Sequence, residues 1–203
     1  MIEDAIKQYQ KAISIDYDNI DAHYNLGVAF KDKGLLDEAI SQWKTVIQIR
    51  HDHVEAYHNL GTAYIYKEQF HRAIEYYKIE INLKSDPLLH HNLGVAYEKV
   101  GLIDNAMMEY ISAINLDPYY AEAYYNLANI YFNKKLFWDA IENYLSAINL
   151  KPYLLEAHFN LGVAYLQIGD ISKAKSQFNA LLKIKPDHKQ AIELLNNISG
   201  ITN

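Results

Sequence analysis

A block containing Asn-Leu-Gly or a close variant recurs five times at nearly constant spacing, and it constrains the fold more than any other feature. Its first copy is Asn25-Leu26-Gly27-Val28-Ala29. Its small residue lies at positions 27, 61, 94, 128 and 162, which gives a period of 34 residues with a single step of 33. A fixed period of this size indicates a stacked array of repeats with one continuous core. An array of this kind predicts a protein that holds a partner, and it does not identify the partner.

Composition excludes several classes of function. Half of the 203 residues are hydrophobic, as in a folded protein, and the formal net charge is −6. The absence of any Lys/Arg run argues against nucleic-acid binding and against membrane-surface binding. No cysteine is present, which excludes disulfides, thiol catalysis and cysteine-bound zinc. We expect no secretory signal and no membrane insertion, and therefore a cytoplasmic protein, unless the chain belongs to a longer one.

Each period divides into two helical halves. In the first, Ala22, Leu26 and Phe30 follow the three- and four-residue spacing of one helix face. Gly34 then favours a turn, and the acidic pair Asp37-Glu38 suits the start of a second helix. The second halves share a small residue at Ala39, Ala73, Ala106, Ala140 and Ala174. An aromatic follows four residues later at Trp43, Tyr77, Tyr110, Tyr144 and Phe178.

This pattern, with prolines at 118, 152 and 186 marking turns between units, resembles the tetratricopeptide repeat (TPR). The resemblance covers nearly the whole chain. It implies an all-α fold, a right-handed α-solenoid of antiparallel helix pairs. Similar arrays precede O-linked N-acetylglucosamine transferases and occur in bacterial TPR scaffold proteins.

We expect one array over residues 1–203. It comprises a half repeat at 1–19 that holds a second helix only, complete repeats at 20–53, 54–86, 87–120, 121–154 and 155–188, and a capping helix at 189–199. The repeat at 54–86 is one residue short, carries Glu80 where the family prefers a small residue, and lacks the turn proline. We therefore expect a kink near 80–87.

The resemblance implies that one face of each first helix lines a concave groove. An asparagine occupies the same groove position in every complete repeat: Asn25, Asn59, Asn92, Asn126 and Asn160, named here the asparagine ladder. The residue before each asparagine is aromatic or histidine: Tyr24, His58, His91, Tyr125 and Phe159. One carboxamide can pair with both the N–H and the C=O of a peptide unit, which predicts recognition of an extended peptide. The alternative is that each asparagine bonds within its own repeat.

Mixed charge along the same face favours a protein or peptide partner that is neutral to mildly basic. The groove lacks the cluster of basic residues with which some relatives clamp acidic tails. His51, Asp52 and His53 with His58 form the best metal candidate, but they divide between a turn and the groove, so we expect no metal. No catalytic motif or phosphate loop is found, so we expect no cofactor and no enzymatic activity.

Two alternatives to groove binding remain open. The half repeat suggests an open apolar face, with Ala5, Ile6, Tyr9 and Ile13, that would favour a longer array or end-to-end self-association. In that case the protein would be a structural module that acts through its ends. Alternatively, the array would be the targeting region of a larger enzyme such as a glycosyltransferase.

Overall fold

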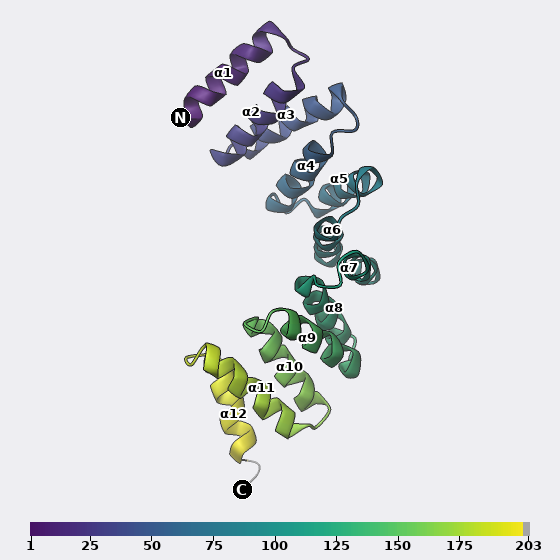
Figure 1. The fold of residues 1–203 in the computed structure, drawn as a ribbon, viewed down its shortest axis with the longest axis vertical. Helices are drawn as coiled ribbons and strands as arrows, with labels where there is room; N and C mark the ends of the chain where they lie inside the picture. The colour runs from purple at the N-terminus through teal and green to yellow at the C-terminus, as the bar shows by residue number, and fades with distance from the viewer. Residues whose placement is uncertain (201–203) are drawn as a thin grey trace. The chain divides into compact units, whose positions relative to one another are not determined.

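The computed structural model describes residues 1–200, and all regular structure in that range is α-helical (Figure 1). The helices are α1 Ile2–Ile15, α2 Ile20–Asp32, α3 Leu36–Ile49, α4 Val54–Tyr66, α5 Phe70–Leu83, α6 Pro87–Lys99, α7 Ile103–Leu116, α8 Ala121–Asn133, α9 Phe137–Leu150, α10 Leu155–Gln167, α11 Ile171–Ile184 and α12 Lys189–Gly200. From α2 to α11, helices of 13 residues alternate with helices of 14. The all-α class and the helix pairs expected from the sequence are therefore confirmed.

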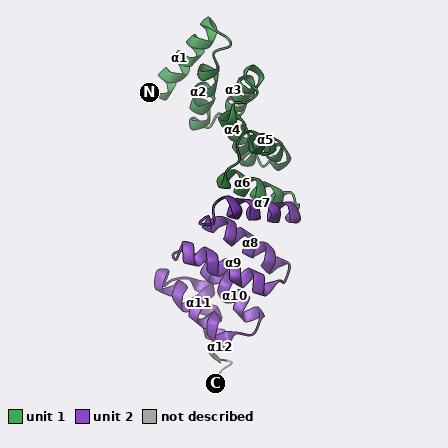
Figure 2. Cartoon of the chain, turned by 45° about the vertical axis from the view of Figure 1, so that its right-hand side comes forward, with its two compact units in different colours: residues 1–102 green, residues 103–203 purple. Residues whose placement is uncertain are grey.

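The chain divides into two compact units, residues 1–102 and 103–203 (Figure 2). Within each unit the helices pack mainly against the helices next to them in sequence. The division falls between α6 and α7. None of the helices in residues 1–200 is long and apolar enough to cross a membrane.

Aromatic side chains of the second helices pack against the small residues of the first. A Cβ added at Gly27 would lie 2.5 Å from Nε1 of Trp43, and one added at Gly162 would lie 2.5 Å from a ring carbon of Phe178. Such distances are well inside van der Waals contact, so the glycines allow a helix backbone and an aromatic ring to touch. The periodic glycine and the periodic aromatic are therefore two halves of one packing device.

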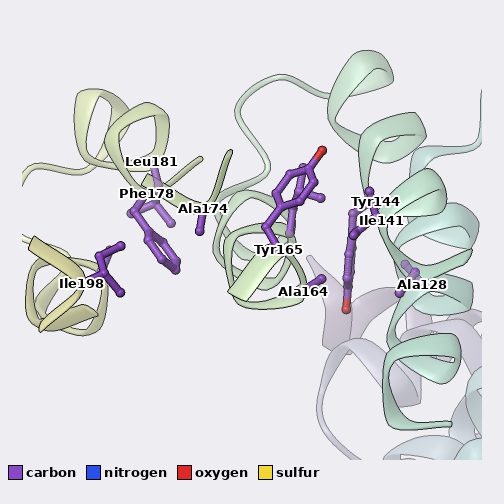
Figure 3. Packing of buried hydrophobic residues seen from close by; sticks show 12 residues of the cluster. Ala128, Ile141, Tyr144, Ala164, Tyr165, Ala174, Phe178, Leu181 and Ile198 are labelled. Atoms are coloured by element: carbon purple, nitrogen blue, oxygen red, sulfur yellow. The ribbon is translucent and has the colours of Figure 1, made fainter. Parts of the chain in front are cut away.

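The second unit has a continuous core built in this way. Tyr144, Phe178 and Leu181 are fully buried, and α12 contributes Ala191 and Ile198 to the same cluster. Figure 3 shows Phe178 lying between Ala174 and Ile198. Helix α12 thus covers apolar surface of α11.

The turns inside the repeats place one residue in the left-handed region. Gly34, Gly101 and Gly169 have φ of 76°, 79° and 78°, and glycine adopts this conformation without steric cost. Glu68 and Lys135 hold the same conformation, with φ of 55° and 62°. The turn geometry is therefore kept in two repeats that lack the glycine.

The first helix differs from the sequence expectation. Ile6 is 6% exposed and packs with Leu26 and Ala29 of α2, and Tyr9 and Ile13 pack against the same cluster. The prediction that Ile6, Tyr9 and Ile13 form an open face was wrong, because a second helix also packs on the first helix of the following repeat. The exposed apolar residues of α1 are Ile2 and Ile15.

The repeat at 54–86 is one residue shorter than the others because the segment that links its second helix to the next repeat is one residue shorter. Residues 84–86 connect α5 to α6, whereas residues 50–53 connect α3 to α4. Asp86 caps α6 by accepting a hydrogen bond from the backbone N–H of Leu89 at 2.9 Å, and Pro87 lies in the first turn, where its missing N–H costs nothing. Both α5 and α6 keep the usual 14 and 13 residues.

Candidate functional site

Two asparagines of the ladder bond to the preceding repeat. Nδ2 of Asn59 on α4 donates to the hydroxyl of Tyr24 on α2 at 3.2 Å. Nδ2 of Asn160 on α10 donates to the hydroxyl of Tyr125 on α8 at 3.3 Å. These bonds join consecutive first helices, an arrangement that differs from the bond within one repeat considered as the alternative. They hold each carboxamide in a defined position.

In the second unit this bond belongs to a larger polar network. Oδ1 of Asn129 accepts hydrogen bonds from Asn160 Nδ2 at 3.0 Å and from the Tyr144 hydroxyl at 2.7 Å. Burial raises the pKa of Tyr144 far above its usual range, so its hydroxyl remains a donor at neutral pH. Asn160 is therefore more firmly engaged inside the protein than Asn59.

The other members of the ladder lie in different surroundings. Asn25 is exposed on α2, while Asn92 on α6 and Asn126 on α8 are half-buried. Asn92 lines a hollow of about 180 Å³ together with Thr62 and Tyr66.

Four of the five residues that precede the ladder asparagines have their rings packed against another ring, either a histidine in a link between repeats or the core aromatic of the same repeat. The ring of Tyr24 stacks on His53 with centroids 5.0 Å apart, and Phe159 packs on His188 at 5.4 Å. The rings of His58 and Tyr125 pack against the core tyrosines of their own repeats, Tyr77 and Tyr144, with centroids 6.2 and 6.1 Å apart. His91 is half-buried on α6. All five predicted positions thus have part of the ring packed against the protein.

The first unit is hollowed beside its asparagines. A hollow of about 520 Å³ lies between α2, α3 and α4 and is lined by His58, Asn59, Thr62 and Tyr66, among others. It shares Thr62 and Tyr66 with the hollow next to Asn92. Tyr66 is 73% exposed. Thr62 and Tyr66 were not among the candidate site residues, because neither residue type recurs at its position, three and seven residues after the asparagine, in the other repeats.

A carboxylate is buried beside Asn59. Glu80 of α5 is 3% exposed, and its Oε1 lies 3.1 Å from Nδ1 of His58. Burial raises the pKa of Glu80, and hydrogen bonding to Glu80 raises the pKa of His58. Both residues line a third hollow, of about 230 Å³, that also includes Tyr24 and Asn59.

The histidines are engaged in packing and capping. Both ring nitrogens of His23 are paired, with Gln42 Oε1 at 2.7 Å and with the carbonyl of Tyr17 at 2.9 Å. His53, a member of the metal candidate set aside in the sequence analysis, accepts a hydrogen bond at Nδ1 from the N–H of Ala56 at 3.3 Å and so caps α4. Among the described residues, no group of three or more His, Asp or Glu side chains is placed to hold a metal ion.

The sequence itself places the chain in a family. It matches the tetratricopeptide repeat at residues 2–34, 29–67, 102–135 and 138–169, and further forms of the repeat at 56–90, 121–153 and 155–188. The chain therefore belongs to the tetratricopeptide repeat family. Comparison with curated proteins found no match.

Solved structures of the family resemble this one over most of its length. YrrB, described as a TPR protein with an unusual peptide-binding site, is 20% identical over 92% of this chain and 96% of its own, with a TM-score of 0.78. A MamA structure is 28% identical over 81% and 97%, with a TM-score of 0.77. MamA from Desulfovibrio magneticus RS-1 is 19% identical over 83% and 96%, with a TM-score of 0.76.

Proposed function

We propose that the protein is an interaction scaffold that binds an extended peptide segment along the asparagine-bearing helices. The observation that carries this proposal is the pair of hollows beside Asn59 and Asn92, which share Thr62 and Tyr66. Together they form a row of polar and aromatic groups along α4 and α6. Repeat arrays characteristically use extended surfaces of this kind to hold their partners.

The asparagines suit main-chain recognition because they are placed before a ligand arrives. The bond between Asn59 and Tyr24 uses one N–H of the carboxamide, and Oδ1 of Asn59 has no hydrogen-bond partner among residues 1–200. A peptide N–H could donate to this oxygen. Each such bond contributes about 0.5–1.5 kcal/mol, so several repeats are needed for useful affinity.

Aromatic rings beside the asparagines give the segment apolar contacts. Tyr66 is largely exposed at the shared edge of the two hollows, and tyrosine offers an apolar ring with a polar tip. The peptide-binding site for which YrrB is described supports a peptide as ligand. A protein or peptide partner that is neutral to mildly basic fits the carboxylates of Glu55, Glu80 and Asp86 on this face.

Selection from a displayed library of random short peptides tests the proposal. An enriched peptide should bind the variant Asn92→Ala more weakly, by roughly 2- to 10-fold for the bond lost. Asn82→Ala, an exposed asparagine of α5, is the matched control and should bind normally. Equal affinity of both variants would exclude the asparagine ladder as the binding element. A selection that enriches no peptide would reject peptide binding altogether.

A further inference from the structure

Glu80 occupies a position that is apolar in every other repeat. The residues at this place in the neighbouring second helices are Val46, Ala113, Ala147 and Leu181, all with 0% exposure. Glu80 is buried almost as deeply, at 3%. A carboxylate in such a place loses most of its hydration, which costs free energy unless other groups replace the water. The substitution therefore calls for a compensating partner.

His58 pairs with one of the two carboxylate oxygens of Glu80. Its Nδ1 pairs with Oε1 of Glu80 at 3.1 Å, and burial of Glu80 Oε2 is complete. Within the described residues, Oε2 has no hydrogen-bond partner. Buried polar atoms are nearly always satisfied in native proteins, so Glu80 lacks one hydrogen-bond donor that a bound group could supply.

The surrounding hollow is shaped and charged for a cation. It measures about 230 Å³, and its ionisable lining consists of Glu55 of α4, Glu80 of α5, Asp86 before α6, and the bases His58 and Lys84. With Glu80 ionised, the three carboxylates outnumber the two bases, so the hollow is net negative whether or not His58 is protonated. A positively charged group is favoured there, and an anion is disfavoured.

We infer that this hollow holds a basic side chain, the ammonium of lysine or the guanidinium of arginine, carried by the bound peptide. The cation pairs with the carboxylate of Glu80, and its apolar stem lies against Tyr24 and Asn59, which line the same hollow. The inference rests on the proposed function, because the cation is a residue of the same bound segment. A bare metal ion fits less well, since no metal-ligand cluster is found in residues 1–200.

Nuclear magnetic resonance titration with n-butylammonium, a minimal lysine side chain, tests the hollow without any peptide. The ring signals of His58 and the side-chain amide of Asn59 should shift saturably, whereas n-pentanol should leave them unchanged. Glu80→Gln keeps the shape of the side chain and removes its charge, so affinity should fall roughly 10-fold or more. Glu80→Ala repeats this test with the residue found at Ala113 and Ala147, in case glutamine perturbs the core.

Two further variants test whether the charges that line the hollow control butylammonium binding. Lys84→Met removes the competing positive charge and should tighten butylammonium binding by about two- to fivefold. Glu75→Ala removes an exposed carboxylate of the same helix and should change nothing. Shifts of equal size in the wild type and in both Glu80 variants, or none in the wild type, would overturn the inference.

The peptide selection separates this inference from the proposed function. The wild type should enrich peptides with Lys or Arg at one position, and Glu80→Gln should lose that preference while still enriching peptides. Peptide binding without a basic preference and without butylammonium binding would reject the hollow and leave the scaffold. Butylammonium binding without any enriched peptide would reject the peptide scaffold and leave the hollow.

Discussion

The side-chain nitrogen of Asn59 donates to the hydroxyl of Tyr24, a residue 35 positions earlier, at 3.2 Å. Asn160 and Tyr125 repeat the relationship at 3.3 Å in the second unit. Asn59 and Asn160 are therefore each oriented by a tyrosine of the preceding repeat. The contribution of this bond to stability can be tested apart from the proposed peptide binding.

Removing the hydroxyl of Tyr24 tests the structural part. Tyr24→Phe should lower the free energy of unfolding by about 0.5–1.5 kcal/mol, because Asn59 loses the acceptor for its N–H. Urea unfolding followed by circular dichroism measures the change. Tyr153→Phe, at a tyrosine that is 81% exposed, is the control and should have no effect. Equal stability of the two variants would show that the bond contributes nothing.

Replacing the buried carboxylate should strengthen the fold. Glu80→Val introduces the residue that Val46 provides one repeat earlier, and we expect stabilisation of about 1–3 kcal/mol because a buried, half-satisfied charge is lost. The same urea experiment reports it. Glu75→Val, on the exposed side of α5, should not stabilise. A destabilised Glu80→Val protein would mean that the pair with His58 outweighs the burial cost.

The cap at His53 predicts a loss of stability in acid. Burial, with a smaller effect of Arg50, lowers the pKa of His53, whose neutral Nδ1 accepts from Ala56. Because the folded pKa lies below the unfolded value of 6.5, this contribution is complete above pH 6.5 and disappears as pH falls through the folded pKa.

His53→Asn should remove that pH dependence. Asn19 caps α2 from the equivalent position, accepting from Ala22 at 2.9 Å, and asparagine does not titrate in this range. Thermal unfolding at several pH values should give a flatter profile for His53→Asn than for the wild type below pH 6.5. Glu55 lies 3.2 Å from His53 and favours the protonated ring, so parallel profiles would mean that this pair offsets the burial.

Two turns hold a residue other than glycine in the left-handed conformation, and replacing such a residue by glycine should stabilise the fold. Lys135 has φ of 62°, a conformation that costs a side-chain-bearing residue about 1 kcal/mol and glycine little. Lys135→Gly should therefore stabilise by up to about 1 kcal/mol, reduced by the greater entropy of an unfolded glycine. Gly169→Ala, at φ of 78°, should destabilise by a similar amount. The prediction fails if both changes have the same sign in urea unfolding.

The repeat pattern predicted the helices well because each helix carries its own periodic face. Leu26, Gly27 and Trp43 indicate packing partners whose spacing recurs, and the structure brings the glycine and the aromatic together. The pattern did not predict that Ile6 packs on α2, because it assigns to a half repeat an open face that α2 in fact covers. The missing contact lies across a repeat boundary, where a period defined within one unit gives no guidance.

The candidate site was less predictable for the same reason. Five equal asparagines in the sequence differ in the structure, since Asn25 is exposed whereas Asn59 is half-buried and bonds to Tyr24. Glu80 stood out as a departure from the pattern, but its pairing with His58, 22 residues earlier, depends on how α4 and α5 pack. Side-chain pairs between helices have no fixed sequence signature.

Helices that pack mainly on their sequence neighbours can also open one after another, from an end or from a weak point. A segment lying across α2, α4 and α6 would add contacts between elements that are otherwise joined mainly through the intervening helices. Its binding energy would then appear as slower hydrogen exchange throughout residues 20–99, well beyond the amides that it touches. For this chain, occupancy of the groove would turn a series of local openings into one cooperative event.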